Sequence, residues 1–207
     1  MRLFLRHPIS IFTTYAAITL NMCEAASAGN RADLGWRETS DSSQCSGYYE
    51  ETVIDSGKEI SASADTANHV EGGSTTFKGN VVVTHENQEL RADSLTIERS
   101  TEIYTAKGNT QLRQPGILLT GESMNGSLLR DTAVIENSHC LLKKNRIRGS
   151  AKKISKLESD ELTIERGSLT TCEPHNDLWE ISGESIILKR TEGYGIARDV
   201  TLKIKGY

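Results

Sequence analysis

The sequence has little proline, few aromatic residues and few cysteines. Among its 207 residues there are 3 Pro and 4 Cys, and aromatic side chains make up 5%. So little proline excludes collagen-like and proline-rich disordered chains, and aliphatic side chains must supply most of any core. The net charge is −4, from 24 Lys and Arg against 28 Asp and Glu. Because binding to nucleic acid needs a basic surface, we expect no nucleic acid partner.

Long uncharged stretches are also missing, except at the N-terminus. There Arg2, Arg6 and His7 precede the mostly apolar segment Ile9 to Met22, and the small residues Ala26-Ser27-Ala28 follow it. This order is typical of a secretory signal with its cleavage site, so residues 1–28 are predicted to be a signal peptide. The alternative is an uncleaved anchor, but serine, threonine and asparagine interrupt a segment that would need about 20 mainly apolar residues.

Removal of the signal, which includes Cys23, leaves Cys45, Cys140 and Cys172. Disulfides can form in an exported chain, and an odd number of cysteines leaves at least one thiol free or paired with another chain. No two of them have a Cys-x-x-Cys spacing, so we expect no metal site.

Residues 29–59 are rich in Ser, Glu, Asp and Gly and are predicted to be irregular, whereas residues 60–207 have the pattern of an all-β domain. Short segments rich in β-branched and apolar residues alternate there with turn signals such as Gly79-Asn80, Gly108-Asn109 and Asn125-Gly126. The predicted strands are Phe77 to Val83, Glu89 to Ile97, Glu102 to Ala106, Thr110 to Arg113, Ile117 to Leu119, Ala133 to Glu136, Glu161 to Glu165, Trp179 to Ser182, Ser185 to Leu188 and Asp199 to Ile204.

A small residue followed by a polar one recurs along this domain. The pairs are Ala64-Asp65, Ala92-Asp93, Gly121-Glu122, Gly149-Ser150 and Gly183-Glu184, at steps of 28, 29, 28 and 34 residues. A period of this length indicates one supersecondary unit stacked on its neighbours, here with two strands in each repeat.

Stacked strand pairs must bury one apolar face. Two interpretations remain open at this point: the face packs into a dry core, or it lines a long groove for acyl chains. The residues expected on this face are Val81, Val83, Leu95, Ile97, Leu112, Leu119, Val134, Ile164, Ile181 and Leu188.

Residues arranged for catalysis are not recognisable in the sequence. His69, His85, His139 and His175 stand singly in polar or turn-like contexts, and we expect them at the surface. The Gly-x-Ser sequences lack the final glycine of a nucleophile elbow. We therefore expect a protein that is not an enzyme and that has no cofactor.

Five segments resemble the N-terminal, OstA/LptA-like periplasmic domain of the LptD family of lipopolysaccharide-assembly proteins. They are Phe77 to Val81, Leu90 to Asp93, Leu169 to Pro174, Trp179 to Glu184 and Gly195 to Ile204. The repeat by itself is shared with LptA, while the Thr-Thr-Cys-x-Pro sequence followed by Trp resembles LptD more specifically. The resemblance covers most of residues 60–204.

The resemblance implies an incomplete β jelly roll that receives lipopolysaccharide from an LptA-type periplasmic bridge, joined to it edge to edge by strand pairing. It implies passage of the lipid along the apolar face to a β-barrel that is associated with LptE. The implied location is the periplasmic face of a Gram-negative outer membrane. Two alternatives remain: a free-standing LptA-like or LptC-like bridge component, and a structural β-repeat protein without lipid.

Cys45 and Cys172 match the family's two cysteines that form disulfides with its barrel. The sequence offers three outcomes: a bond between the two, bonds to a separate barrel chain, or none. About 145 of the residues after the signal belong to the repeat, so no room for a barrel is expected within the 207 residues.

Overall fold

The computed structural model describes residues 36–37, 47–50, 54, 57–127, 129–174 and 178–205, and every regular element in them is a β-strand. The predicted signal peptide and Cys45 lie outside the described residues. The strands are β1 (Trp36–Arg37), β2 (Tyr48–Tyr49), β3 (Ser61–Ser63), β4 (Thr66–His69), β5 (Ser74–His85), β6 (Gln88–Glu98), β7 (Ile103–Gln114), β8 (Ile117–Ser127), β9 (Thr132–Leu142), β10 (Ile147–Lys156), β11 (Glu161–Thr170), β12 (Trp179–Lys189) and β13 (Tyr194–Ile204).

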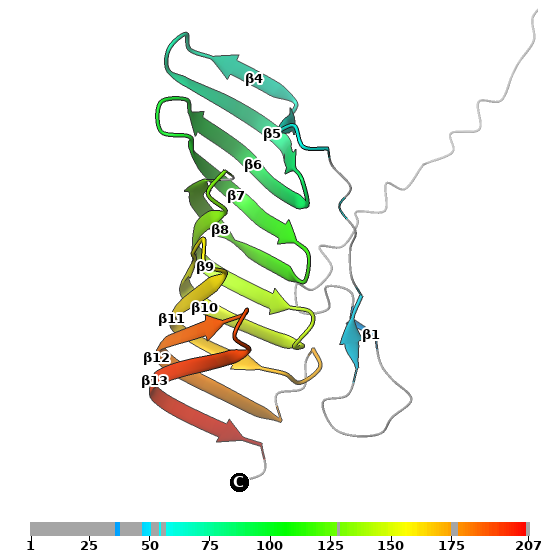
Figure 1. Ribbon diagram of the computed structural model, residues 1–207, viewed down its shortest axis with the longest axis vertical. Coiled ribbons are helices and arrows are strands. Elements are labelled where there is room, and N and C mark those ends of the chain that lie inside the picture. The colour runs from blue at the N-terminus through cyan, green and yellow to red at the C-terminus, as the bar shows by residue number, and fades with distance from the viewer. Residues whose placement is uncertain are drawn as a thin grey trace, which may run out of the picture.

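From β5 onward the strands form an antiparallel meander in which each strand pairs with the next along the chain. In the described residues this gives one 11-stranded sheet, with β3 and β4 sharing the free side of β5 and with β13 at the other edge. Figure 1 shows the strands stacked from β4 at the top to β13 at the bottom. The sheet does not close on itself, so the predicted all-β, incomplete jelly roll is confirmed.

Each repeat contains two strands, as the period predicted, and its recurring residues lie where the strands bend. Every odd-numbered strand from β5 to β13 contains one non-glycine residue with positive φ: Asn80, Asn109, Asn137, Arg166 and Asp199. Such left-handed residues are typical of β-bulges, which bend a strand. These positions follow one another across the sheet, and we call this row the fold line.

Asparagine side chains attach the fold line to the repeat's acidic residues. Asn80 Nδ2 donates to the carboxylate of Asp65 at 3.1 Å, and Asn109 Nδ2 donates to Asp93 at 3.0 Å. The preceding Gly108 has φ +73°, and a Cβ there would lie 2.2 Å from Asp93 Oδ2. The Gly-Asn sequences predicted as turns therefore lie inside long strands. The continuous strand β7 had been predicted as two strands, Glu102 to Ala106 and Thr110 to Arg113.

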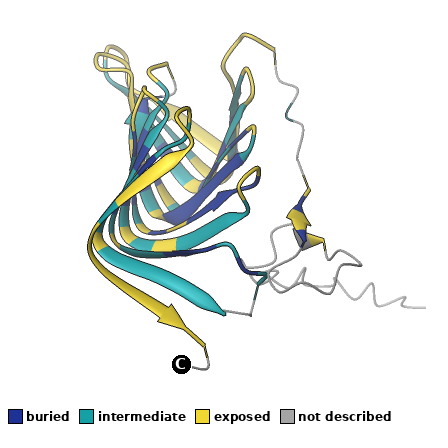
Figure 2. Cartoon of the chain, turned by 60° about the horizontal axis from the view of Figure 1, so that its bottom comes forward, coloured by how far each residue is buried: buried dark blue, intermediate teal, exposed yellow. Residues whose placement is uncertain are grey.

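Folding along this line gives the sheet an inner and an outer face. Buried apolar residues of the inner face form one cluster that extends from Val81 on β5 to Leu188 on β12. In Figure 2 the sheet is seen to bend into two arms, with buried positions repeated from strand to strand. At about 1.5–3 kcal/mol for each fully buried large aliphatic side chain, this cluster supplies most of the favourable energy of the fold.

A short N-terminal segment packs on the outer face, within the region predicted to be irregular. Tyr49 of β2 is buried against Leu118 of β8 and Leu141 of β9. Lys143 Nζ donates to the carbonyl oxygen of Glu50 at 2.5 Å. Both faces of the sheet are therefore covered at the start of β8, where five consecutive residues are buried.

Candidate functional site

The predicted apolar residues are brought together on the inner face, with one exception. Each of the following is at most 8% exposed and belongs to the single buried cluster: Val81, Val83, Leu95, Leu112, Leu119, Ile164 and Leu188. Ile97 and Ile181 are partly buried and pack against it. The sequence thus identified most of a continuous apolar surface, and its role as a lipid lining stays a prediction.

Val134 is the exception, and its expected position was wrong. It is 38% exposed, whereas its neighbours Ala133 and Ile135 are completely buried in the inner-face cluster. Because side chains alternate along a strand, Val134 lies on the outer face. Ala133 and Ile135 take the place in the inner lining that Val134 had been given.

Sequence reasoning also missed inner-face residues on every strand from β6 to β11. The fully buried ones include Leu90, Met124, Ile154 and Leu162. A signal for Leu90 and Leu162 was present, since each stands two residues from another buried apolar residue, Ala92 or Ile164, and period two is the mark of a half-buried strand.

The inner face becomes exposed at the C-terminal edge. Leu202 and Ile204 of β13 pair with Ile181 and Trp179 of β12, so they continue the same face. Val200, Leu202 and Ile204 are nevertheless 45%, 58% and 49% exposed. The inner apolar surface is therefore packed closed through the middle of the stack and open at β13, the edge nearest the viewer in Figure 2.

One charged side chain is buried among these apolar residues. Lys156 is 1% exposed, and its Nζ lies 2.6 Å from Oδ2 of Asp131, whose side chain is 43% exposed. A lysine so deeply buried requires a charged partner, which Asp131 supplies. Lys156 stands two residues after the inward-facing Ile154 on β10, and the sequence analysis did not single it out.

The cysteines differ in state. Cys140 is free and buried within the inner-face cluster, and burial raises the pKa of its thiol to about 12, so it is unreactive in the folded protein. Cys172 is completely buried and disulfide-bonded. Its segment is held by Arg148, which donates to the carbonyl oxygens of Cys172 and Glu173, each at 3.0 Å. A bond between Cys45 and Cys172 stays a prediction.

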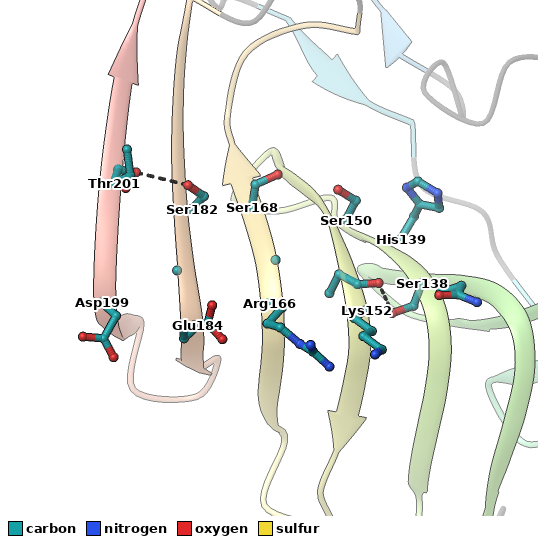
Figure 3. A pocket seen from close by; sticks show the side chains of 14 residues that line it. Ser138, His139, Ser150, Lys152, Arg166, Ser168, Ser182, Glu184, Asp199 and Thr201 are labelled. Atoms are coloured by element: carbon teal, nitrogen blue, oxygen red, sulfur yellow. Dashed lines mark hydrogen bonds between the residues drawn. The ribbon is translucent and has the colours of Figure 1, made fainter.

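A hollow of about 700 Å³ lies on the outer face over β9 to β13. Figure 3 shows that Ser150, Ser168, Ser182 and Thr201 follow one another across its floor, with charged residues such as Arg166 and Glu184 nearer the fold line. Such a row of small hydroxyl groups is typical of a solvated sheet face.

The described histidines and acidic residues do not gather into a site. His69 and His139 are exposed and His85 is half-buried, while His175 lies outside the described residues. No group of three or more His, Cys, Asp or Glu side chains in the described part is arranged to hold a metal ion. The same part of the chain contains no helix long and apolar enough to cross a membrane.

The structure is thus a folded, open antiparallel sheet with a continuous apolar inner face. Residues 59–194 match the family described as LptA/(LptD N-terminal domain) LPS transport protein. The chain belongs to this family.

Curated relatives carry the name LPS-assembly protein LptD. That of Chromohalobacter salexigens is 31% identical over 165 residues, covering 77% of this chain and 20% of the relative. Those of Hahella chejuensis and Saccharophagus degradans are 32% and 34% identical, covering 78% and 61% of this chain. This chain spans only 15% to 22% of the length of these relatives.

Among solved structures, LptH of Pseudomonas aeruginosa, described as the LptA-homologous periplasmic component of its lipopolysaccharide transport device, aligns with a TM-score of 0.30 and 13% identity. The alignment covers 72% of this chain and 96% of that one. A likeness this distant carries no argument about function.

Proposed function

We propose that this domain binds lipopolysaccharide by its acyl chains on the inner face and passes it along the stack of strands towards β13. The observation that carries the proposal is the unbroken apolar surface from β5 to β12 that ends in the exposed Val200, Leu202 and Ile204. Exposed apolar residues that continue a buried surface are expected where a ligand or a partner covers them.

The interpretation as a groove differs from the dry core in what happens when lipid enters. In this structure the apolar side chains of the inner face pack in one cluster. Acyl chains would replace those contacts by similar apolar contacts, with little net change in free energy. Each methylene transferred from water contributes about 0.8 kcal/mol, so several acyl chains bind tightly without any directional bonds. Transfer of this kind breaks no covalent bond, which agrees with the expectation that the domain is not an enzyme.

The proposed location is the periplasmic face of the outer membrane in a Gram-negative cell. The free edge formed by β3 and β4 at one end and by β13 at the other would allow pairing with further strands. We expect an LptA-type bridge at one edge, and transfer at the other end to a β-barrel with LptE, as the family resemblance implies. The energy for one-way flow comes from outside this domain.

Site-specific photo-crosslinking tests the proposal. Leu202 faces inward and Lys203, the next residue on β13, faces outward, and both are well exposed, so neither replacement creates a cavity. With a benzophenone amino acid at Leu202 or at the partly buried Ile181, we expect lipopolysaccharide adducts; at Lys203 we expect none. Absence of adducts at both inward positions, or equal adducts at Lys203, would overturn the proposal in favour of a β-repeat protein without a lipid site.

A further inference from the structure

Folding of the sheet brings the two opposite ends of the meander together at Asp131. Gln88 begins β6 and Gln114 ends β7, so both lie at one end of the meander, whereas Asp131 precedes β9 at the opposite end. A flat strand of eleven residues would separate these ends by about 36 Å. Asp131 Oδ1 nevertheless accepts hydrogen bonds from Gln114 Nε2 at 2.5 Å and from Gln88 Nε2 at 3.3 Å. We call this side, where the arms of the folded sheet touch, the mouth.

The side chains around the Asp131 carboxylate are hydrogen-bond donors. Lys156 Nζ lies 2.6 Å from Oδ2 and also donates to the backbone oxygen of Asp131 at 3.0 Å. An ammonium and two amide groups that converge on one carboxylate make the arrangement of an anion-binding site. The anion in this structure is the carboxylate of a side chain from the β8–β9 turn of the protein itself.

Tyr104 supplies a further donor. It is 2% exposed, and its hydroxyl group is buried with no hydrogen-bond partner in the part of the chain that the structure describes. Burial first, and then the negative charge of Asp131, raise the pKa of Tyr104 above its usual value, so the hydroxyl keeps its proton. A buried donor without an acceptor is costly, and an anion larger than a carboxylate would satisfy it.

There is space at the mouth beside this cluster. A hollow of about 300 Å³ is bordered by Glu86, Gln88 and Gln114 from one end of the meander and by Asp131, Asp160 and Arg190 from the other. Water takes up about 30 Å³ per molecule, so an ionic group with part of its hydration fits. Arg190 is paired with Asp160 and adds a second cation at this rim.

We propose that Gln88, Gln114, Lys156 and Tyr104 form a binding site for a phosphate group of the lipid, which Asp131 occupies when no lipid is bound. This inference rests on the proposed function, because acyl chains on the inner face would place a phosphate of the lipid's sugar headgroup at the rim. Entry of the phosphate displaces the Asp131 carboxylate and breaks the contact that joins the two arms. Asp131 thus acts as a closing contact that phosphorylated lipid releases.

The first test compares the affinity of the chain for lipid A and for enzymatically dephosphorylated lipid A, both solubilised in the same detergent. A charge-assisted hydrogen bond corresponds to about a tenfold to a hundredfold preference for the phosphorylated form. Lys156→Met should remove this preference and keep binding of the dephosphorylated form. Lys153→Met is the matched control, because Lys153 lies on the same strand in an ion pair with Glu165, and it should keep the preference.

The opposite variant sharpens the test. Asp131→Asn removes the competing carboxylate, so affinity for phosphorylated lipid A should rise by about tenfold or more, the reverse of the Lys156→Met effect. Far-ultraviolet circular dichroism establishes that each variant is folded. A wild-type protein that binds both lipids equally overturns this inference and leaves the proposed function standing, whereas failure to bind either lipid overturns the proposed function.

Opening of the mouth can be measured directly with nitroxide labels on cysteines introduced at Asn87 and Leu129. Both positions are exposed, in the β5–β6 and β8–β9 turns on opposite sides of the mouth. The label distance should increase with lipid A and stay unchanged with the dephosphorylated form. An equal increase with millimolar inorganic phosphate would overturn the assignment to a lipid phosphate, and an unchanged distance with lipid A would overturn the closing role of Asp131.

Discussion

Truncation of Leu119 tests whether the inner face is the stabilising core of this sheet. Its side chain is completely buried, and on β8 it stands between Leu112 of β7 and Cys140 of β9. Both flanking strands are themselves paired on their other side, so the surroundings can relax little around a missing isopropyl group. Leu→Ala changes in cores cost about 2–5 kcal/mol, and we expect Leu119→Ala to fall in the upper half of that range.

Val134→Ala is the matched control, from the neighbouring strand and the opposite face. Val134 is 38% exposed, so its truncation removes less apolar surface from contact and leaves no enclosed cavity. The expected cost is under about 1 kcal/mol, including the lower strand propensity of alanine. The difference between the two variants measures the asymmetry of the two faces.

Urea denaturation followed by circular dichroism gives both values. With m of about 1–3 kcal/mol/M, the urea midpoint should fall by about 1–5 M for Leu119→Ala and by less than about a third of that for Val134→Ala. Equal m values are needed for the comparison, because a changed m indicates a changed unfolded or folded state. If Val134→Ala lowers the midpoint as much as Leu119→Ala, the assignment of the two faces is refuted.

Two further predictions concern the fold line and an ion pair. In chemical denaturation, Gly108→Ala should lower the free energy of unfolding more than Gly193→Ala does. Both glycines have positive φ, but only at Gly108 would a Cβ clash with Asp93. Equal losses of stability would contradict this packing argument. The second concerns Glu89, whose pKa is lowered chiefly by its hydrogen bond from Arg91. A lowered pKa stabilises the fold above the ordinary carboxyl pKa of about 4.3, and this contribution is lost as pH falls through the folded-state pKa. Arg91→Met should therefore lower the free energy of unfolding by about 0.5–1 kcal/mol at pH 7, and the variant should lose less stability than the wild type when the pH falls below about 4.5. Parallel curves of stability against pH for the two proteins would contradict this.

The sequence predicted the class of fold because its two signals have local causes. Period two in segments such as Glu89 to Ile97 reflects one buried face, and the recurring Ala-Asp and Gly-Glu pairs reflect the fold line. What it missed was strand length. A Gly-Asn pair with positive φ occurs both in tight turns and in β-bulges. At Gly108-Asn109 the bulge forms because Asn109 bonds to Asp93 of the neighbouring strand, a contact that is not local in the sequence.

The inner-face prediction failed at Val134 for a similar reason. Ala133, Val134 and Ile135 form a continuous apolar run, so alternation gives no phase, and ranking by hydrophobicity favours Val over Ala. Pairing settles the phase in the structure, because Ile135 lies opposite Met124 on β8 and Ile154 on β10, all completely buried.

The contact between Asp131 and Lys156 lies beyond any local signal, and it also bears on whether the interior is an ordinary core. Taking the Lys156 ammonium group out of water costs several kcal/mol, and an apolar side chain of the same volume would often stabilise a core equally well. Ile154, two residues before Lys156 on the same face, shows that an aliphatic side chain fits this surface. The ion pair also lies at the mouth, where Asp131 stays 43% exposed and can exchange its donors for water or for an incoming anion. A charge at that position is poorly suited to fixing a permanent core and well suited to a contact that opens, which favours an interior that admits a ligand over one that is permanently dry.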